Sequence, residues 1–92
     1  MPRLSDEDVR AGLPEGWEFD GSAIRKDFTF PGFKAAIAFI DRVAEKAHEA
    51  RHHPDLANSY NRVTVTLTTH NEGGVTAHDL VLARHIESVV EP

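Results

Sequence analysis

The sequence contains no cysteine, and this absence already limits its chemistry. Without cysteine there is no disulfide framework, no thiolate nucleophile and no thiolate ligand for a metal ion. Long apolar runs are missing as well, because no stretch approaches the roughly 18 residues that a membrane-spanning helix needs. The segment Met1–Asp8 also lacks the apolar core of a signal peptide. These absences lead us to expect a cytoplasmic protein.

Positive charge is also scarce. The chain has 10 Lys and Arg against 15 Asp and Glu, which gives a net charge of −5. Proteins that hold phosphate backbones gather Lys and Arg into patches, and no such cluster is present in this sequence. We therefore expect no direct binding of nucleic acid.

The 92 residues are enough for one domain, residues 1–92, and too few for two. A chain of this size buries roughly 60–65% of the surface that it exposes when unfolded, so its core is thin. Association with further copies is one way to bury more apolar surface.

The first half of the sequence predicts a short helix, a hairpin and a long helix. Ser5 precedes three acidic residues, which favours a helix over residues 5–11. Segments 17–19 and 23–30 flank the turn signal Asp20-Gly21-Ser22 and predict a hairpin. A helical period of about five turns then begins, and Pro54 ends it because proline disfavours the helical conformation of the preceding residue. The predicted buried stripe of this helix is Phe33, Ile37, Ile40, Val43, Ala44 and Ala47.

The second half predicts two strands and a last helix. Residues 56–60 form a possible short strand, and residues 62–69 alternate valine or leucine with threonine, which is typical of a strand. After a loop at 71–74, Thr76-Ala77-His78-Asp79 resembles a capping box that opens a helix through about Val90, with Leu82, Ala83, Ile86 and Val90 buried. We expect an α+β domain in which three helices pack on one face of a four-stranded antiparallel sheet.

Six histidines are present, and three of them fall within residues 48–53. The string His48-Glu49-Ala50-Arg51-His52 matches H-E-x-x-H, in which two imidazoles on one helix face hold zinc and the Glu acts as general base. Such a site needs a third protein ligand, and Pro54 ends the helix just where the second imidazole would need support. A zinc peptidase is therefore the least favoured function, and an exposed helix face is the simpler account of His48.

Four further motifs form a second pattern: His52-His53-Pro54, Tyr60, Thr69-His70 and Asp79. With them the chain resembles the pterin-4a-carbinolamine dehydratase family. Its signature is a His-His-Pro at a helix end, an aromatic residue, a Thr-His at a strand end, and an Asp nine residues after that His. The resemblance covers about residues 10–90, through Trp17, Phe28-x-Phe30, residues 33–39 and Leu82-Ala83. Many members carry an acidic residue four positions before the first histidine, where this chain has His48 with Glu49 beside it.

The resemblance implies a tetrahydropterin substrate that carries a hydroxyl on carbon 4a. Its dehydration needs one proton delivered to the departing hydroxyl and one removed from the ring system. Histidine, with an unperturbed pKa near 6.5, suits both steps, and no metal or organic cofactor is implied. By resemblance, His52 and His70 carry the acid–base role and His53 orients the substrate. We expect binding or orienting roles for Thr68, Thr69, Asn71, Glu72, Asp79, His48 and Trp17, with backbone groups of residues 68–72 on the pterin ring.

Several of these residues also have a purely structural interpretation. As the fourth residue of the capping box, Asp79 would satisfy a backbone N–H at the helix start, worth about 1 kcal/mol. It would otherwise orient His70 or the loop that carries it. We interpret Trp17 and Tyr60 as packing residues that could also flank a flat heterocycle, and the histidines at 78 and 85 as exposed.

The resemblance also bears on partners. It implies a homodimer or a homotetramer, and it leaves a second function open, because members of the family also act as dimerisation or assembly proteins. The presence of all three histidines, at 52, 53 and 70, favours the enzyme over a non-catalytic protein on the same fold.

Overall fold

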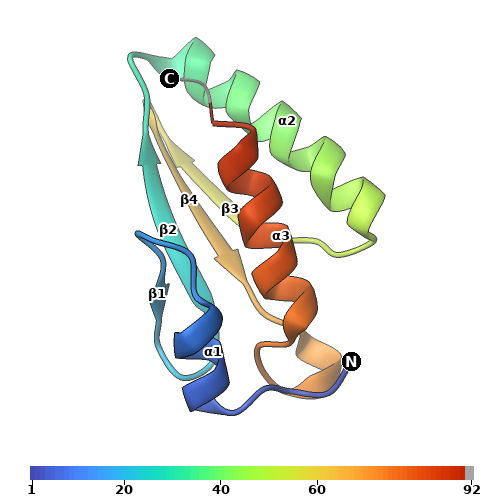
Figure 1. Ribbon diagram of the computed structural model, residues 1–92. Coiled ribbons are helices and arrows are strands. Elements are labelled where there is room, and N and C mark those ends of the chain that lie inside the picture. Colours follow the sequence, from blue (N-terminus) through green and yellow to red (C-terminus); the bar gives the residue numbers. More distant parts are fainter. Residues whose placement is uncertain (91–92) are drawn as a thin grey trace.

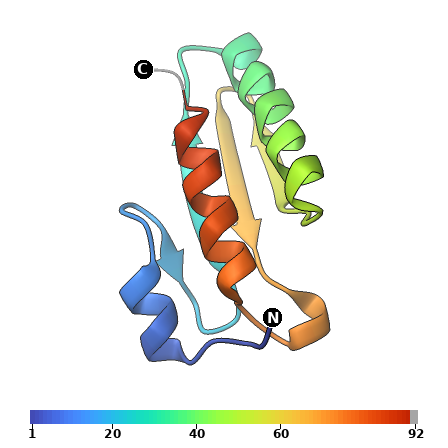
Figure 2. The same ribbon diagram turned by 45° about the vertical axis from the view of Figure 1, so that its right-hand side comes forward.

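The computed structural model describes residues 1–90, in which three α-helices lie on one side of a four-stranded sheet. The helices are α1 (Asp6–Gly12), α2 (Phe33–Ala50) and α3 (Ala77–Ser88), with a short 3-10 turn, η1 (His70–Glu72). The strands β1 (Glu18–Phe19), β2 (Ile24–Thr29), β3 (Asp55–Ser59) and β4 (Arg62–Leu67) pair antiparallel in the order β1-β2-β4-β3. The predicted α+β class and layering are confirmed (Figures 1 and 2). No helix within residues 1–90 is both long and apolar enough to cross a bilayer.

The core lies between the sheet and the helices. Alternation along β4 places Val63, Val65 and Leu67 on the helix side, where all three are fully buried. β2 runs antiparallel beside β4, with Ile24 opposite Leu67 and Phe28 opposite Val63, so its apolar residues face the same way. The predicted threonine face of β4 is the opposite one, and Thr64 there donates to the Asp27 carboxylate at 2.7 Å.

The buried stripe of α2 differs from the predicted one. Phe39 and Ala36 are fully buried, whereas Phe33 is 53% exposed and Ala44 is exposed. Val43 and Ala47 are buried as predicted, and Ile40 is partly buried. The first two turns of α2 are apolar on more than one side, so periodicity alone does not choose which side faces the sheet. The ring of Phe39 decides the matter, because it packs between Phe28 and Phe30 at centroid distances of 4.8 and 4.9 Å.

The polar residue Lys26 lies among apolar neighbours on the helix side of β2, and a carboxylate on α3 accepts a hydrogen bond from its ammonium group. Its Nζ atom donates to Glu87 Oε2 at 2.7 Å, and the indole N–H of Trp17 donates to the same oxygen at 2.9 Å. Trp17 is 5% exposed and packs edge-on against Phe28. This shared carboxylate therefore ties the hairpin to the last turn of α3.

The difference between the predicted and the observed buried face of α2 can be tested by truncating one phenylalanine on each face. We expect Phe39→Ala to lower the free energy of unfolding by about 3–5 kcal/mol, because it opens a cavity in a packed core. Phe33→Ala, the matched control, should cost less than about 1 kcal/mol. Urea unfolding of the two variants at equal protein concentration measures both values. Equal losses would show that the described face of α2 is not the buried one.

Candidate active site

A cavity of about 220 Å³ lies where the end of α2 meets the loop between β4 and α3. It brings together all three histidines expected to act on the substrate, from segments 17 or more residues apart in the sequence. Figure 2 shows why, since the end of α2 and the start of α3 lie toward the same end of the molecule. The wall of the cavity is formed by Arg51, His52, His53, Thr68, Thr69, His70 and Asn71.

The first two histidines of the cavity follow a break in the backbone at the end of α2. Arg51 adopts the left-handed conformation, with φ of 54°, and its N–H donates to the carbonyl of His48. The N–H of His52 donates to the carbonyl of Ala47 at 3.1 Å, so the helix ends in a tight turn and not as a straight extension. His52 and His53 therefore leave the helix axis before Pro54, and His53 is exposed.

The third histidine is presented by a closed loop. Thr69 and Gly74 exchange backbone hydrogen bonds in both directions, at 2.9 and 3.3 Å, which pins the base of the loop to the end of β4. Gly73 supplies the left-handed residue, with φ of 74°, that closes η1 onto the carbonyl of His70. His70 and Asn71 therefore project at the tip of the loop, where both are exposed and line the cavity.

Asp79 lies behind the wall of the cavity, fully buried in the first turn of α3. Its Oδ2 atom accepts the backbone N–H of Thr76 at 2.9 Å and the hydroxyl of Thr69 at 2.8 Å. Its Oδ1 atom is hydrogen-bonded to His52 Nε2. The predicted capping box is confirmed, and the carboxylate also reaches the loop through Thr69. The histidine that it contacts is His52, whereas the sequence interpretation had named His70.

The side chains of Thr68 and Thr69 are both used within the protein. The hydroxyl of Thr68 donates to the carbonyl of Ser22 at 2.8 Å, and that of Thr69 donates to Asp79. The carbonyl of Thr69 accepts the N–H of Glu72 at 3.0 Å, so the backbone of Thr69 is engaged in the loop as well. Each residue thus shapes the wall, and neither hydroxyl is free to serve as a ligand donor.

Besides the buried Asp79, three residues expected to bind or orient a substrate are not part of the cavity wall: Trp17, His48 and Glu72. Trp17 bonds Glu87 in the last turn of α3, about 12 Å along the helix from Asp79 in the first turn. Glu72 is exposed in the η1 turn and is absent from the wall. Two residues near the site were missed: Arg51 in the wall, and His78, whose ring centroid is 6.1 Å from that of His52. The sequence offered one signal for these two residues, because Arg51 directly precedes His52 and His78 directly precedes Asp79.

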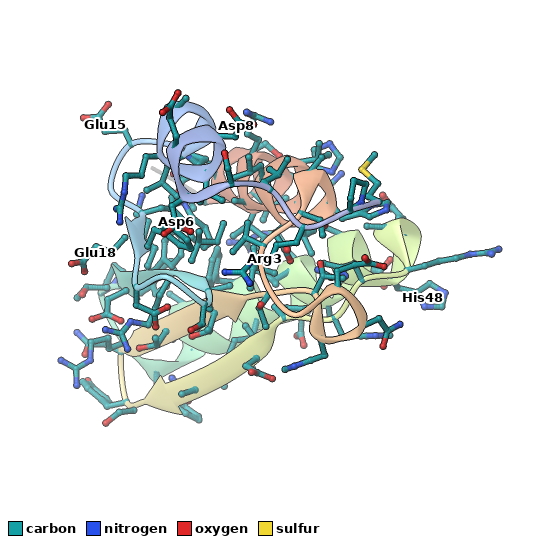
Figure 3. The ribbon with its side chains drawn as sticks, turned by 90° about the horizontal axis from the view of Figure 1, so that it is seen from below. Arg3, Asp6, Asp8, Glu15, Glu18 and His48 are labelled. Atoms are coloured by element: carbon teal, nitrogen blue, oxygen red, sulfur yellow. The ribbon has the colours of Figure 1, made fainter. Side chains whose placement is uncertain are left out.

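The H-E-x-x-H string does not have the geometry of a zinc site. α2 ends at Ala50, so His48 and His52 are not four residues apart on one helix. Figure 3 shows the His48 side chain at the outer edge of the molecule. The ring of His52 is instead hydrogen-bonded to the buried carboxylate of Asp79. Within residues 1–90, no three His, Asp or Glu side chains are gathered closely enough to hold a metal ion.

Comparison with known proteins agrees with the fold. The family model described as "Pterin 4 alpha carbinolamine dehydratase" matches residues 2–89. A Thermomicrobium roseum protein named "Putative pterin-4-alpha-carbinolamine dehydratase" is 49% identical, over 94% of this chain and 95% of that protein. A Thermosynechococcus vestitus protein of the same name is 46% identical, over 95% and 94%. A Brucella melitensis crystal structure, described as a transcriptional coactivator/pterin dehydratase, has a TM-score of 0.89 and 38% identity, and the match covers 97% of this chain and 99% of that one.

The fold, together with the family match over residues 2–89, defines a protein of the pterin dehydratase class. The chain belongs to the pterin-4-alpha-carbinolamine dehydratase family. The same fold also occurs in a pterin dehydratase-like protein identified as a RuBisCO assembly factor of the alpha-carboxysome. That structure has a TM-score of 0.71 and 20% identity, over 83% of this chain and 90% of that chain, so the likeness is one of fold.

The absence of a helical zinc geometry at His48 and His52 predicts how the protein responds to chelation. Elemental analysis of protein purified without added metal should find far less than one zinc per chain. Dialysis against EDTA should leave the melting temperature unchanged, because residues 1–90 contain no cluster of three His, Asp or Glu side chains that could hold a metal ion. One zinc per chain, lost together with stability on His48→Ala, would contradict the geometry described above.

Proposed function

We propose that the chain catalyses the dehydration of 4a-hydroxytetrahydropterin, the pterin-4a-carbinolamine, to quinonoid dihydropterin and water. The proposal places this reaction in the cytoplasm, as a step in the recycling of tetrahydrobiopterin. The observation that carries it is the convergence of His52, His53 and His70 on one cavity of a chain that belongs to this family. No cofactor enters the proposal, because imidazoles alone supply the required proton transfers.

The chemistry balances with two imidazoles. An acid gives a proton to the hydroxyl on carbon 4a, and that carbon–oxygen bond breaks as water leaves. A base removes one proton from the ring system, whose electron pair forms the new double bond. Each turnover thus moves one proton from ring to protein and one from protein to water, and exchange with solvent restores both imidazoles.

The environments of the three histidines support separate roles. The side chain of His52 is 15% exposed and is tied to the buried Asp79, so its ring is held in one orientation. His70 and His53 are exposed, so both can exchange protons with water between turnovers. We assign the acid–base work to His52 and His70 and substrate orientation to His53. We expect backbone groups of residues 68–72 to form hydrogen bonds with the pterin ring.

Stopped-flow measurement of 4a-hydroxytetrahydropterin dehydration tests these assignments. His52→Ala and His70→Ala should each lower kcat by about 10²–10⁴, the usual contribution of a positioned acid or base. His53→Ala should act more on KM than on kcat, because its role is orientation. His85→Ala, an exposed histidine on α3 outside the cavity wall, is the control. Unchanged kcat in both the His52 and His70 variants would overturn the proposal.

An assembly role on the same fold is the second candidate, favoured by the pterin dehydratase-like structure identified as a RuBisCO assembly factor. The same variants separate the two functions. If His52→Ala and His70→Ala abolish dehydration yet complement a deletion strain fully, the interaction function is the biological one. If complementation fails together with dehydration, the enzymatic activity is the biological function.

We also propose that the chain forms a homodimer or a homotetramer. All five residues of the edge strand β3 are exposed, among them Leu56, and β3 is paired on one side only, with β4. An open edge of this kind is a ready template for pairing with another strand. Light scattering at micromolar concentration should therefore give two or four times the mass of one chain. A monomer at every concentration would refute this.

A further inference from the structure

Two threonines behind the cavity extend the contact between Asp79 and His52. The hydroxyl of Thr69 lies 2.8 Å from Asp79 Oδ2 and 3.0 Å from the hydroxyl of Thr76. Thr76 and Asp79 are the two fully buried polar residues of the described chain, and neither is left without a hydrogen-bond partner. The four residues form an unbroken row: Thr76, Thr69, Asp79 and His52.

The direction of each hydrogen bond in this row follows from simple counting. A carboxylate only accepts, so the single hydrogen of the Thr69 hydroxyl points to Asp79 Oδ2. The Thr69 oxygen can then meet Thr76 only as an acceptor, so Thr76 donates to it. The Thr76 oxygen in turn accepts the backbone N–H of His78 at 3.2 Å. Every donor in the row therefore points toward the carboxylate.

The same counting assigns the proton on His52. With two donors already on Oδ2, the Oδ1 atom of Asp79 accepts from His52, so Nε2 carries the hydrogen. We infer that Thr76, Thr69 and Asp79 hold neutral His52 as its Nε2–H tautomer, which leaves Nδ1 as the atom that takes the proton from the substrate. Thr69 and Thr76 are thereby positioning residues, which act on the reaction through Asp79. The catalytic part of this inference rests on the proposed function; the tautomer does not.

Nδ1 of His52 is accessible for this role. Within residues 1–90, no protein hydrogen bond occupies this atom, and no buried side-chain nitrogen lacks a partner. Nδ1 is therefore open to solvent, and His52 forms part of the cavity wall. A neutral imidazole with a bare Nδ1 can only accept a proton there, which makes His52 the base and leaves the acid role to His70. Once Nδ1 is protonated, Asp79 still faces the Nε2–H of the charged ring, where a carboxylate stabilises it.

Thr69 has a second reason to matter, because it positions two parts of the site at once. Its hydroxyl fixes the carboxylate that holds His52, and its backbone closes the loop that presents His70. Serine retains the hydroxyl, whereas valine has the shape of threonine without it. Thr64 offers a matched control: its hydroxyl also donates to an aspartate, Asp27, at 2.7 Å, but on the exposed sheet face.

Nitrogen-15 NMR of histidine-labelled protein, recorded with the imidazoles neutral, reads the tautomer directly. Resonances of residue 52 are assigned by comparison with His52→Gln. We expect wild type and Thr64→Val to show Nε2 protonated and Nδ1 bare, and Thr69→Val to show a mixture of both tautomers. A wild-type His52 protonated on Nδ1 would overturn the inference without any variant, so a failure of Thr69→Val to fold leaves the test intact.

Kinetics supply the second readout. Thr69→Val should lower kcat by about tenfold with KM nearly unchanged, the effect expected from loss of one hydrogen bond to a charged group. Thr69→Ser should recover most of that loss, and Thr64→Val should lose nothing. Equal kcat in Thr69→Val and wild type would refute the positioning role. Wild-type protein that shows the expected tautomer but no dehydratase activity would refute the proposed function and leave the tautomer assignment standing.

Discussion

The buried carboxylate of Asp79 is the contact on which the site depends. One side chain caps the start of α3, holds the loop after β4 through Thr69, and fixes the ring of His52 at the end of α2. The end of α2 is far in sequence from the other two segments, and within residues 1–90 no backbone hydrogen bond joins α2 to the loop directly. A single acidic residue therefore sets the relative positions of the elements that carry His52 and His70.

Such sharing has an energetic logic. A carboxylate is costly to bury unless donors surround it, and here a backbone N–H, a hydroxyl and an imidazole all face it. Because the cap of α3 already requires an acceptor at this place, the orientation of His52 needs no further buried charge. In a chain with a thin core, this shared carboxylate links the stability of the last helix to the geometry of the cavity.

Most of the fold could be predicted from local signals. The alternation at residues 62–67, the turn at Asp20-Gly21-Ser22 and the capping box at Thr76 each correspond to the observed element. The phase of α2 could not, because apolar residues surround its first turns and only tertiary packing around Phe39 selects a face.

Part of the candidate site could also be predicted from local motifs, and part could not. Its three histidines came from motifs that are short in sequence. The partner of His52 lies 27 residues away, and which imidazole it meets depends on how the end of α2 turns at Arg51. No spacing of residues in the sequence predicts that turn, because the left-handed backbone conformation of Arg51 depends on its surroundings in the fold. For the same reason the proximity of His78 to His52, and the distance of Trp17 from the cavity, became apparent only in three dimensions.

A crystal structure of the protein with a dihydropterin bound is the most direct measurement of the central claim. The account predicts the flat ring in the cavity between the ends of α2 and β4. Nδ1 of His52 should lie within hydrogen-bond distance of the ring, with its Nε2 still bonded to Asp79. A ligand bound elsewhere, or one that takes Nε2 from the carboxylate, would contradict it.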